Sequence, residues 1–461
     1  MEDYAAEGKS LARVDGKVIF AEQTIPGDVV DLRLTRNKKD WAEGVPVFFH
    51  SYSDERVEPF CEHFGVCGGC QWQMLPYEKQ LEYKQKQVGD NLRRIGRIDL
   101  PEIAPILGAA ATRYYRNKIE YTFSAEAFIP KEKFAELKAM GENPHEYGRL
   151  GVAGFHAKGF WDKIVDINTC YLQREPTNAI RQEVKNFALA NGYTFYDLRG
   201  QSGLMRNMQL RICETGEWMA NIVFGEDDAE KREKLLKHIL QKFPDITSLL
   251  YTINTKKNDS LHDLEPMVFH GKGYVIERLE DFDFKIGPKS FFQTNTRQGT
   301  ELYKVTRDFA ELDGRQTLYD LYCGTGSIGI FCSKGAKRVV GVEVIAEAIA
   351  DAKENALLNN IEHTSFYAGD VIDICTDDFF AAHGRPDVII TDPPRAGMHE
   401  KLVNKINEIA APLVVYVSCN PATQARDLAL LNEKYEVTRV QPVDMFPHTL
   451  HIENVLQLKL R

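Results

Sequence analysis

Four continuous apolar runs in the last third of the chain place the strongest constraint on its fold. Patterns typical of amphipathic helices separate them, and the runs are residues 318–321, 339–342, 388–390 and 413–417. Strands of a parallel sheet that helices cover on both faces have this composition. Residues 285–461 are therefore predicted to form a doubly wound, Rossmann-like α/β domain.

Two further regions precede this domain. Residues 1–55 contain short strand-like runs broken by turn signals, which predict a small OB-like β-barrel; a hairpin packed on a larger domain is the alternative. Glu7-Gly8, so near the start, indicates that a first strand is short or missing. Residues 56–284 mix strand-like runs with helical patterns and an exposed insertion at 129–147, which predicts an α+β domain.

Composition restricts the location and the partners of the protein. No apolar run approaches the ~20 residues of a membrane span, and the start of the chain lacks the features of a signal peptide. We therefore expect a cytoplasmic protein with no membrane partner, and nothing in the sequence indicates more than a monomer. The 57 basic and 67 acidic side chains give a net charge of −10, so any surface for a nucleic acid must be local.

A glycine-rich turn follows the first strand of the predicted α/β domain. Asp320-Leu-Tyr-Cys-Gly-Thr-Gly-Ser327 opens a helix, and its glycines permit close approach of the backbone to a ligand. Glu343 ends the second strand, where a carboxylate can accept from a ribose diol. Asp370, after the third strand, can accept from an adenine amine. The pattern predicts a nucleotide-like ligand, and a plain turn with a capping acid is the alternative.

The residues at the end of the fourth strand distinguish a methyltransferase from an enzyme that transfers hydride. Thr391-Asp-Pro-Pro-Arg395 puts a polar side chain before two prolines, which form a rigid wall for a flat base beside a sulfonium. An NAD oxidoreductase has no need of such a wall. Together with the glycine turn, this motif resembles S-adenosylmethionine-dependent methyltransferases of the Rossmann-like class.

A cysteine and a carboxylate are candidates for the chemistry. Cys419 lies at the end of the fifth strand, where parallel sheets place reactive groups; a buried structural cysteine is the alternative. Glu453 is a carboxylate that burial can tune toward a base, or else an ordinary surface acid. A thiolate that adds to an electron-poor ring can convert the ring to an enolate, whose carbon then attacks a methyl donor. A base must afterwards remove a ring proton so that the thiolate can leave.

Four motifs in combination resemble the RNA uracil-5 methyltransferase family: Phe292-Gln-Thr-Asn295, Asp392-Pro-Pro-Arg395, Ser418-Cys-Asn-Pro421 and His451-Ile-Glu453. The resemblance covers essentially the whole chain. It implies that Cys419 is the nucleophile and Glu453 the general base. It also places the donor S-adenosylmethionine on Gln293, Tyr322, Glu343 and Asp392, to which we add Asp370.

Three of the nine cysteines share one short loop, Cys61-x5-Cys67-Gly-Gly-Cys70, and Cys170 is the candidate for a fourth ligand from elsewhere. The odd number of cysteines and the absence of a secretion signal disfavour a disulfide framework. Four thiolates bind zinc or an iron–sulfur cluster, and spacing alone favours zinc. The ribosomal RNA branch of the same family is similar here, which implies a structural 4Fe-4S cluster on these four cysteines.

Basic residues interleaved with aromatic ones mark a candidate RNA contact. Arg113-Tyr-Tyr-Arg-Asn-Lys118 suits phosphates and stacked bases, so Arg113, Tyr115, Arg116 and Lys118 are candidate RNA-binding residues; a solvated surface is the alternative. Residues 1–55 resemble the TRAM domain, an OB-like RNA-binding module, and contribute Lys38 and Lys39.

The sequence therefore predicts an enzyme that transfers a methyl group from S-adenosylmethionine to carbon 5 of a uridine in 23S ribosomal RNA. The alternatives are the same reaction on the T-loop uridine of tRNA and a non-catalytic RNA-binding protein. The TRAM-like region and the cysteines favour ribosomal RNA, because the tRNA branch typically lacks both. The presence of both Cys419 and Glu453 disfavours a protein that has lost catalysis.

Overall fold

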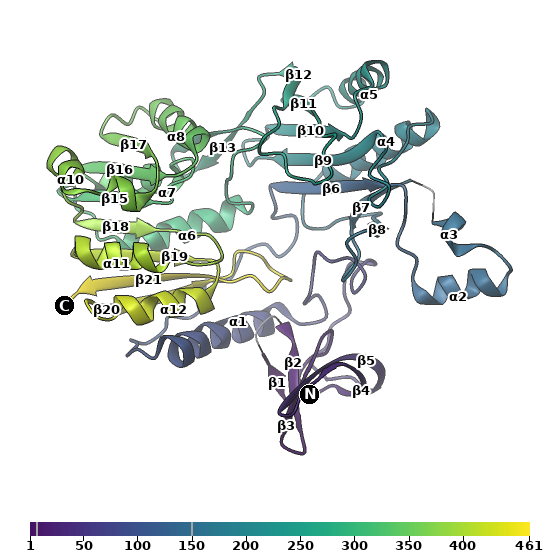
Figure 1. Cartoon of the computed structure of the whole chain (residues 1–461), viewed down its shortest axis with the longest axis horizontal. Helices are drawn as coiled ribbons and strands as arrows, with labels where there is room; N and C mark the ends of the chain where they lie inside the picture. Colours follow the sequence, from purple (N-terminus) through teal and green to yellow (C-terminus); the bar gives the residue numbers. More distant parts are fainter. Residues whose placement is uncertain (6–7, 149–150) are drawn as a thin grey trace.

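The computed structural model describes residues 1–5, 8–148 and 151–461, and its strands form three main sheets and one hairpin (Figure 1). None of the described helices is both long and apolar enough to cross a lipid bilayer. The predicted short first strand is β1 (Asp3–Tyr4), whereas Glu7, part of the same prediction, lies outside the described residues.

The N-terminal sheet has five strands in the order β1-β2-β3-β5-β4 and lies at the bottom of Figure 1. β3 is parallel to β5, and the other bounds are β2 (Ser10–Val14), β3 (Lys17–Ala21), β4 (Val29–Asn37) and β5 (Trp41–Ser51). Met1 joins the starts of β1 and β4, because its amino group donates to the Asp28 carbonyl (2.6 Å) and its carbonyl accepts from Gly27 N (2.9 Å). The sheet therefore curls so that its two edges approach each other.

The central sheet has seven strands in the order β12-β11-β10-β9-β6-β7-β8. Their bounds are β6 (Lys118–Ser124), β7 (Val152–His156), β8 (Ile164–Asp166), β9 (Met205–Ile212), β10 (Trp218–Phe224), β11 (Ser248–Ile253) and β12 (Met267–Gly271). Apolar side chains of α4 (Thr177–Ala190) and α5 (Ala229–Lys242) share a core with the strands. The predicted insertion contains α2 (Lys131–Ala139) and α3 (Pro144–Tyr147), which project to one side in Figure 1.

The C-terminal sheet also has seven strands, in the order β17-β16-β15-β18-β19-β21-β20. The four apolar runs are β15 (Thr317–Leu321), β16 (Arg338–Glu343), β18 (Val388–Thr391) and β19 (Leu413–Ser418), and β17 (Thr364–Ala368) extends them in parallel. β21 (Glu453–Leu460) runs antiparallel to both β19 and β20 (Tyr435–Val443). The predicted doubly wound α/β domain is therefore confirmed, with an antiparallel edge.

Helices cover both faces of this sheet, and they are α6 (Thr296–Phe309), α7 (Ser327–Cys332), α8 (Ala346–Leu358), α9 (Val371–Ile374), α10 (Asp377–His383), α11 (Glu400–Ile409) and α12 (Pro421–Leu431). Leu318 and Val339 belong to the core on one face, whereas their neighbours Tyr319 and Val340 belong to the core on the other. Because both faces are buried, the strands are apolar without alternation.

Two segments outside residues 285–461 also pack on this domain. α1 (Tyr77–Asn91) continues into a short π-helix (Leu92–Gly96), and its Val88 lies in the same core as the β19 residues. Ile103 and Leu107 then form parallel bridges with Val440 and Val443 of β20. The hairpin β13 (Val275–Leu279) and β14 (Phe282–Ile286) joins the other core. The C-terminal unit is thus larger than the predicted boundary at residue 285 allows.

Candidate active site and cysteine cavity

The glycine turn at the end of β15 has an unusual backbone that keeps it close to the strand. Tyr322, Gly324 and Gly326 have φ of 62°, 53° and 76°, so the chain reverses before α7 begins. Asp320 Oδ2 accepts from Gly329 N (2.8 Å), and a Cβ at Gly329 would lie 2.9 Å from that oxygen. Glycine at position 329 therefore lets the helix approach the strand.

The two predicted ribose and adenine acids lie at the ends of neighbouring strands. Glu343 Oε2 accepts from Gly324 N (3.3 Å) and its Oε1 accepts from Ile345 N (3.1 Å), so this carboxylate borders the glycine turn. Asp370 accepts from Ile372 N (2.9 Å) and caps α9. Both carboxylates can still accept further hydrogen bonds. Asp370 in addition caps a helix, which is the alternative role that the sequence leaves open for an acid in this pattern.

A contact between domains holds the segment that carries Gln293. This residue is buried and precedes α6, and its carbonyl accepts from Asn117 Nδ2 (2.8 Å). The same Asn117 amide donates to Thr296 Oγ1 (2.9 Å) at the start of α6. A residue of the central region thus fixes the segment that carries Gln293.

Strand register brings Cys419 to Glu453. β19 pairs with β21 so that Ser418 lies opposite Asn454, and the next residues along are Cys419 and Glu453. The carbonyl of Arg395, three residues after Asp392, accepts from Asn420 Nδ2 (3.1 Å). The loops after β18 and β19 are therefore joined at the carboxyl edge of the parallel strands, where α/β sheets place their ligands.

Burial raises the pKa of each of the three candidate groups of this site. Burial raises the pKa of the Cys419 thiol to about 12, and the charges of Glu453 and Asp392 add to this effect. Burial likewise raises the pKa of Asp392 to about 7, and it raises the pKa of Glu453 well above its usual range, with the charge of Asp392 as a further cause. The resting site therefore holds a neutral thiol at neutral pH.

Two residues that sequence reasoning did not select also belong to this site. Burial raises the pKa of Asp320 to about 7, and its Oδ1 is buried without a hydrogen-bond partner among the described residues. The hydroxyl of Tyr303 of α6 lies 2.8 Å from Ser327 Oγ. Burial raises the pKa of Tyr303, and the charges of Asp392, Asp320 and Glu453 add to this effect. Asp320 could have been found as the last acid before the glycine turn, but nothing in the helical pattern marks Tyr303.

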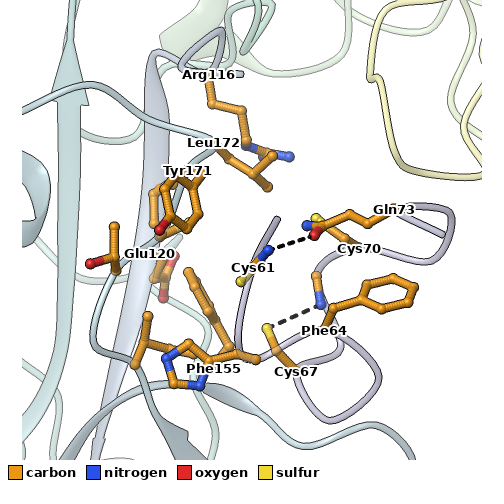
Figure 2. Close-up of a pocket in the computed structure, with 16 residues that line it drawn as sticks. Cys61, Phe64, Cys67, Cys70, Gln73, Arg116, Glu120, Phe155, Tyr171 and Leu172 are labelled. Carbon is orange, nitrogen blue, oxygen red and sulfur yellow. Dashed lines mark hydrogen bonds between the residues drawn. The ribbon is translucent and has the colours of Figure 1, made fainter. Parts of the chain in front are cut away.

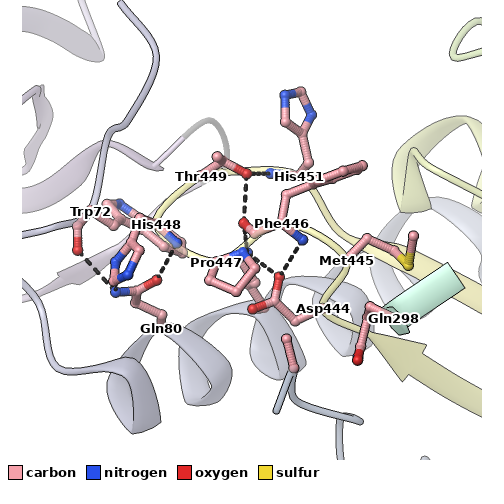
Figure 3. A network of polar contacts seen from close by, with 12 residues as sticks. Trp72, Gln80, Gln298, Asp444, Met445, Phe446, Pro447, His448, Thr449 and His451 are labelled. Carbon is pink, nitrogen blue, oxygen red and sulfur yellow. Dashed lines mark hydrogen bonds and ion pairs between the residues drawn. The ribbon is translucent and has the colours of Figure 1, made fainter. Parts of the chain in front are cut away.

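The loop that leads into Glu453 is held by α1 (Figure 3). Lys84 Nζ donates to Asp444 Oδ1 (2.7 Å), and both side chains are fully buried. Tyr77 donates its hydroxyl to the other oxygen of Asp444 (2.8 Å), and His448 N donates to Gln80 Oε1 (2.8 Å). The His448 carbonyl accepts from the amides of residues 71 and 72, so the segment just after Cys70 contacts the same loop.

The four predicted cysteine ligands line one cavity of about 310 Å³ (Figure 2). Burial raises the pKa of Cys67 to about 11 and that of Cys70 to about 12, and the charges of the other cysteines contribute to both shifts. Burial also raises the pKa of Cys61 and of Cys170. The structure thus brings Cys170, from a distant part of the chain, to the loop of the other three.

The donor groups of the cavity are sulfur atoms from two parts of the chain. Within residues 1–5, 8–148 and 151–461, no three His, Cys, Asp or Glu side chains converge on a point where they could hold a metal ion. Four thiols around one cavity are nevertheless the donor set that zinc or an iron–sulfur cluster takes.

The predicted RNA motif divides into an exposed and a buried part. Arg113 is exposed, with its guanidinium 3.8 Å from the centre of the Phe60 ring. Tyr115 is only 7% exposed and donates to the Pro447 carbonyl (3.0 Å), so its ring has no free face for a base. The exposed ring of the motif is that of Tyr114, at 48%. The expectation for Tyr115 is therefore corrected.

Arg116 and Lys118 lie partly inside. Arg116 lines the cysteine cavity and lies 5.7 Å from the centre of the Phe446 ring. Burial lowers the pKa of Lys118, and the neighbouring charge of Arg211 adds to the effect. The side chains of these two residues are therefore directed mainly into the protein, and only part of each is available at the surface.

Comparison with known proteins agrees with this geometry. The family model described as tRNA (Uracil-5-)-methyltransferase matches residues 267–461. A Bacteroides thetaiotaomicron protein described as an uncharacterized RNA methyltransferase is 51% identical over 460 residues, which are 99% of this chain and 100% of that one. A Porphyromonas gingivalis protein with the same description is 48% identical over 460 residues, 99% of this chain and 98% of that one.

A solved structure extends the match to the fold of the whole chain. The Pyrococcus abyssi tRNA (uracil-54, C5)-methyltransferase in complex with S-adenosyl-L-homocysteine has a TM-score of 0.75 and 29% identity, and the match covers 99% of this chain and 98% of that chain. Taken with the strand order, the glycine turn and the adjacent Cys419 and Glu453, these matches show that the chain belongs to the RNA uracil-5 methyltransferase family and is an S-adenosylmethionine-dependent enzyme.

Proposed function

We propose that this enzyme methylates carbon 5 of a uridine in 23S ribosomal RNA through a covalent bond between Cys419 and carbon 6 of the base. The observation that carries the proposal is the register of β19 and β21, which sets a cysteine beside a buried carboxyl group at the ligand edge of the sheet. A nucleophile and a base at this spacing suit a reaction that needs both on one ring.

The residues act in sequence. S-adenosylmethionine, when bound, supplies the methyl group. The thiol of Cys419 loses its proton to water, and the thiolate sulfur adds to carbon 6 of the uracil. The new S–C6 bond leaves an enolate, whose carbon 5 takes the methyl group as the donor's S–CH3 bond breaks. Glu453, in its ionised form, then removes the proton from carbon 5, and the electron pair of that bond expels the Cys419 thiolate. Gln293, Tyr322, Glu343, Asp370 and Asp392 hold the donor in this scheme.

We further propose that Cys61, Cys67, Cys70 and Cys170 hold a 4Fe-4S cluster with a structural role. Support comes from the shared cavity, which the four thiols line, and from the mutual effects on the pKa values of these thiols. Such a cluster would pin the loop after β5 to the central sheet.

We propose that the exposed Arg113 and Tyr114 contact the RNA, with the half-buried Arg116 and Lys118 beside them. We also propose that a TRAM-like N-terminal sheet presents the exposed Lys38 and Lys39. The order of that sheet, with β3 parallel to β5 and its edges joined through Met1, supports an OB-like arrangement. We place the enzyme in the cytoplasm as a monomer.

The T-loop uridine of tRNA is the second candidate substrate. The observation that favours it is the whole-chain match to the Pyrococcus abyssi enzyme, whose description names a tRNA uracil as its target. An N-terminal region that matches a tRNA enzyme does not by itself distinguish the two substrates. The resemblance of the four cysteines to the ribosomal RNA branch keeps 23S ribosomal RNA as the first choice.

The test is incubation with methyl-labelled S-adenosylmethionine and two unmodified transcripts, a 23S ribosomal RNA and a tRNA. We expect label in the ribosomal transcript, mapped as 5-methyluridine, and none with the Cys419→Ala variant, which should still bind the donor. Label only in the tRNA would keep the mechanism and contradict the substrate. Label in neither, with free transcripts and with ribosomal particles, would contradict both.

A further inference from the structure

A buried arginine that forms no ion pair with any described residue lies near Cys170 of the cysteine cavity. Arg181 of α4 is 0% exposed, and its Nη2 donates to the Asn168 carbonyl (2.7 Å). Its Nε and Nη1 are buried and have no hydrogen-bond partner among the described residues. The Tyr121 ring, whose centre is 5.1 Å away, gives only partial compensation for the charge.

The carboxylates around Arg181 are engaged elsewhere. Asp166 forms an ion pair with Lys185. Glu175 accepts from Asn178 N (3.1 Å) and Ala179 N (3.1 Å) at the start of α4. The charges of Asp166 and Glu175 act on Arg181 from a distance, but among the described residues neither forms an ion pair with it. A charged guanidinium buried without a direct counter-ion is strongly unfavourable, which favours an anion beyond these two carboxylates.

Arg181 is linked to two residues that line the cavity. Cys170 N donates to Asn178 Oδ1 (2.8 Å), and Asn178 Nδ2 donates to the Cys170 carbonyl (3.2 Å), so the start of α4 encloses the backbone of Cys170. Asn168, the partner of Arg181, donates its N–H to Nε2 of His63 (2.9 Å), which also lines the cavity. The anion that Arg181 lacks is therefore expected on this side of the cavity.

We propose that Arg181 is the buried counter-charge of an anionic iron–sulfur cluster held by the four cysteines, and that it sets the reduction potential and the retention of that cluster. The proposal rests on the cluster proposed above. Four thiolates around a 4Fe-4S core carry a net negative charge, and net charge is one of the factors that set its potential. Arg181 contacts no reacting atom, so its proposed role is to place a positive charge beside the cluster and not to take part in methyl transfer.

Other charged groups around the cavity are less suited to this role. Arg116 lines the cavity, but it is partly exposed and its Nε donates to the Lys118 carbonyl (3.3 Å), so solvent screens its charge. Glu120 would repel an anion. Reduction adds one negative charge to the cluster, and a buried cation favours that state. Loss of the Arg181 charge should therefore lower the reduction potential.

The experiment uses the full chain purified without air. Wild type, Arg181→Met and Arg181→Lys are analysed for iron and sulfide, titrated potentiometrically, and then followed for iron loss in air. We expect iron in the wild type, a more negative potential and faster iron loss in Arg181→Met, and values near the wild type in Arg181→Lys, which keeps the charge. Arg181→Gln, a neutral polar variant, should behave like Arg181→Met and replaces it if the methionine variant does not fold.

Arg206 provides a matched control. It is also buried, at 2% exposure, but its guanidinium donates to the carbonyls of Asn254 (2.6 Å) and Asn258 (2.7 Å) and pairs with Asp259. Arg206→Met should leave the potential unchanged. An Arg181→Met protein with wild-type potential and iron retention, or an equal shift in Arg206→Met, would overturn the counter-charge. An iron-free wild type would overturn the proposed cluster itself, and the role of Arg181 with it.

Discussion

Carboxyl groups, rather than cations, surround the thiol of Cys419. Reactive cysteines usually lie near positive charge, which lowers their pKa. Here the charges of Glu453 and Asp392 add to the effect of burial in raising the pKa of Cys419, and Arg395 opposes them only in part. A cationic sulfonium in the same site would favour the ionised forms of all three groups. The methyl donor is thus expected to assist the nucleophile before it reacts.

Replacing Asp392 by Asn should make Cys419 easier to ionise. Burial raises the pKa of the thiol to about 12, and at a pH above about 7, where Asp392 is ionised, the substitution removes a negative charge beside it. The curve of Cys419 alkylation rate against pH should therefore move to lower pH, as measured with iodoacetamide and peptide mass spectrometry. Asp373→Asn, an exposed acid on α9, is the control. An unshifted curve in Asp392→Asn would contradict the electrostatic argument.

Replacing Glu453 by Gln should separate methyl transfer from product release. The amide cannot take the carbon-5 proton, so the RNA should remain bonded to Cys419, and turnover should fall by about 10²–10⁴-fold, the usual contribution of a general base. A band that combines protein and RNA in a denaturing gel measures the trapped adduct. The double variant Cys419→Ala/Glu453→Gln should show no such band. Full turnover without an adduct would exclude Glu453 as the base.

The position of a residue at a strand end could be read from the sequence, but its exposure could not. Cys419, Asp392 and Glu343 follow apolar runs, and parallel strands bring such positions to one edge. Tyr114 and Tyr115 are adjacent and identical in type, and only packing against the loop before Glu453 decides which ring is buried. Tyr303 was missed because a polar atom inside a helix gives no local signal.

At the scale of elements, α1 belongs to the N-terminal part of the sequence but packs on the C-terminal domain. Lys84→Met should destabilise the fold by about 3–5 kcal/mol, because it leaves the fully buried Asp444 without its cation. Chemical denaturation measures the loss. The double variant Lys84→Met/Asp444→Asn should lose less, since no charge then remains buried. A larger loss in the double variant would contradict this account.

Lys79 on the same helix is the matched control for Lys84. It pairs with Glu55 and Glu82 at the surface, with 33% of its side chain exposed. Lys79→Met should therefore cost about 0–1 kcal/mol, as exposed ion pairs do. An equal loss of stability in Lys84→Met and Lys79→Met would show that burial does not determine how much an ion pair contributes.

Helical periodicity predicted these elements but not their partners. The helical patterns expected between the apolar runs are confirmed, for example by α8, and α1 is one of the helices expected within residues 56–284. The sequence nevertheless assigned α1 to the central region, whereas it packs on the C-terminal sheet. A periodic apolar stripe shows that a face is buried, and it carries no information about which core covers it.

At the scale of the whole molecule, a net charge of −10 makes RNA binding depend on local surfaces. Lys38 and Lys39 are exposed at the turn between β4 and β5, and β5 adds exposed Val47 (60%) and Phe48 (57%). The double variant Lys38→Glu/Lys39→Glu should weaken RNA binding. It should also reduce the magnitude of the slope of log K against log salt concentration by about 1–2. Binding titrations at several salt concentrations measure both.

A matched charge change elsewhere tests whether the effect is local. Lys234→Glu/Lys237→Glu alters two exposed residues of α5, at the opposite end of the molecule from the N-terminal sheet in Figure 1. This variant should keep the RNA affinity and the salt dependence of the wild type. Equal losses in both double variants would indicate a general effect of net charge and exclude a TRAM-like contact at β4 and β5.

The pairing of Lys84 with Asp444 also has a consequence for synthesis of the protein. The two residues are 360 positions apart, so α1 leaves the ribosome long before its partners exist. At about 5–20 residues per second, the delay is roughly 20–70 s. During that interval the apolar side of α1 and the 103–107 segment are open to chaperones or to misassembly. The strand that carries Glu453 is also made after α1 and after β19, so a nascent chain cannot complete its catalytic site until β21 has been translated.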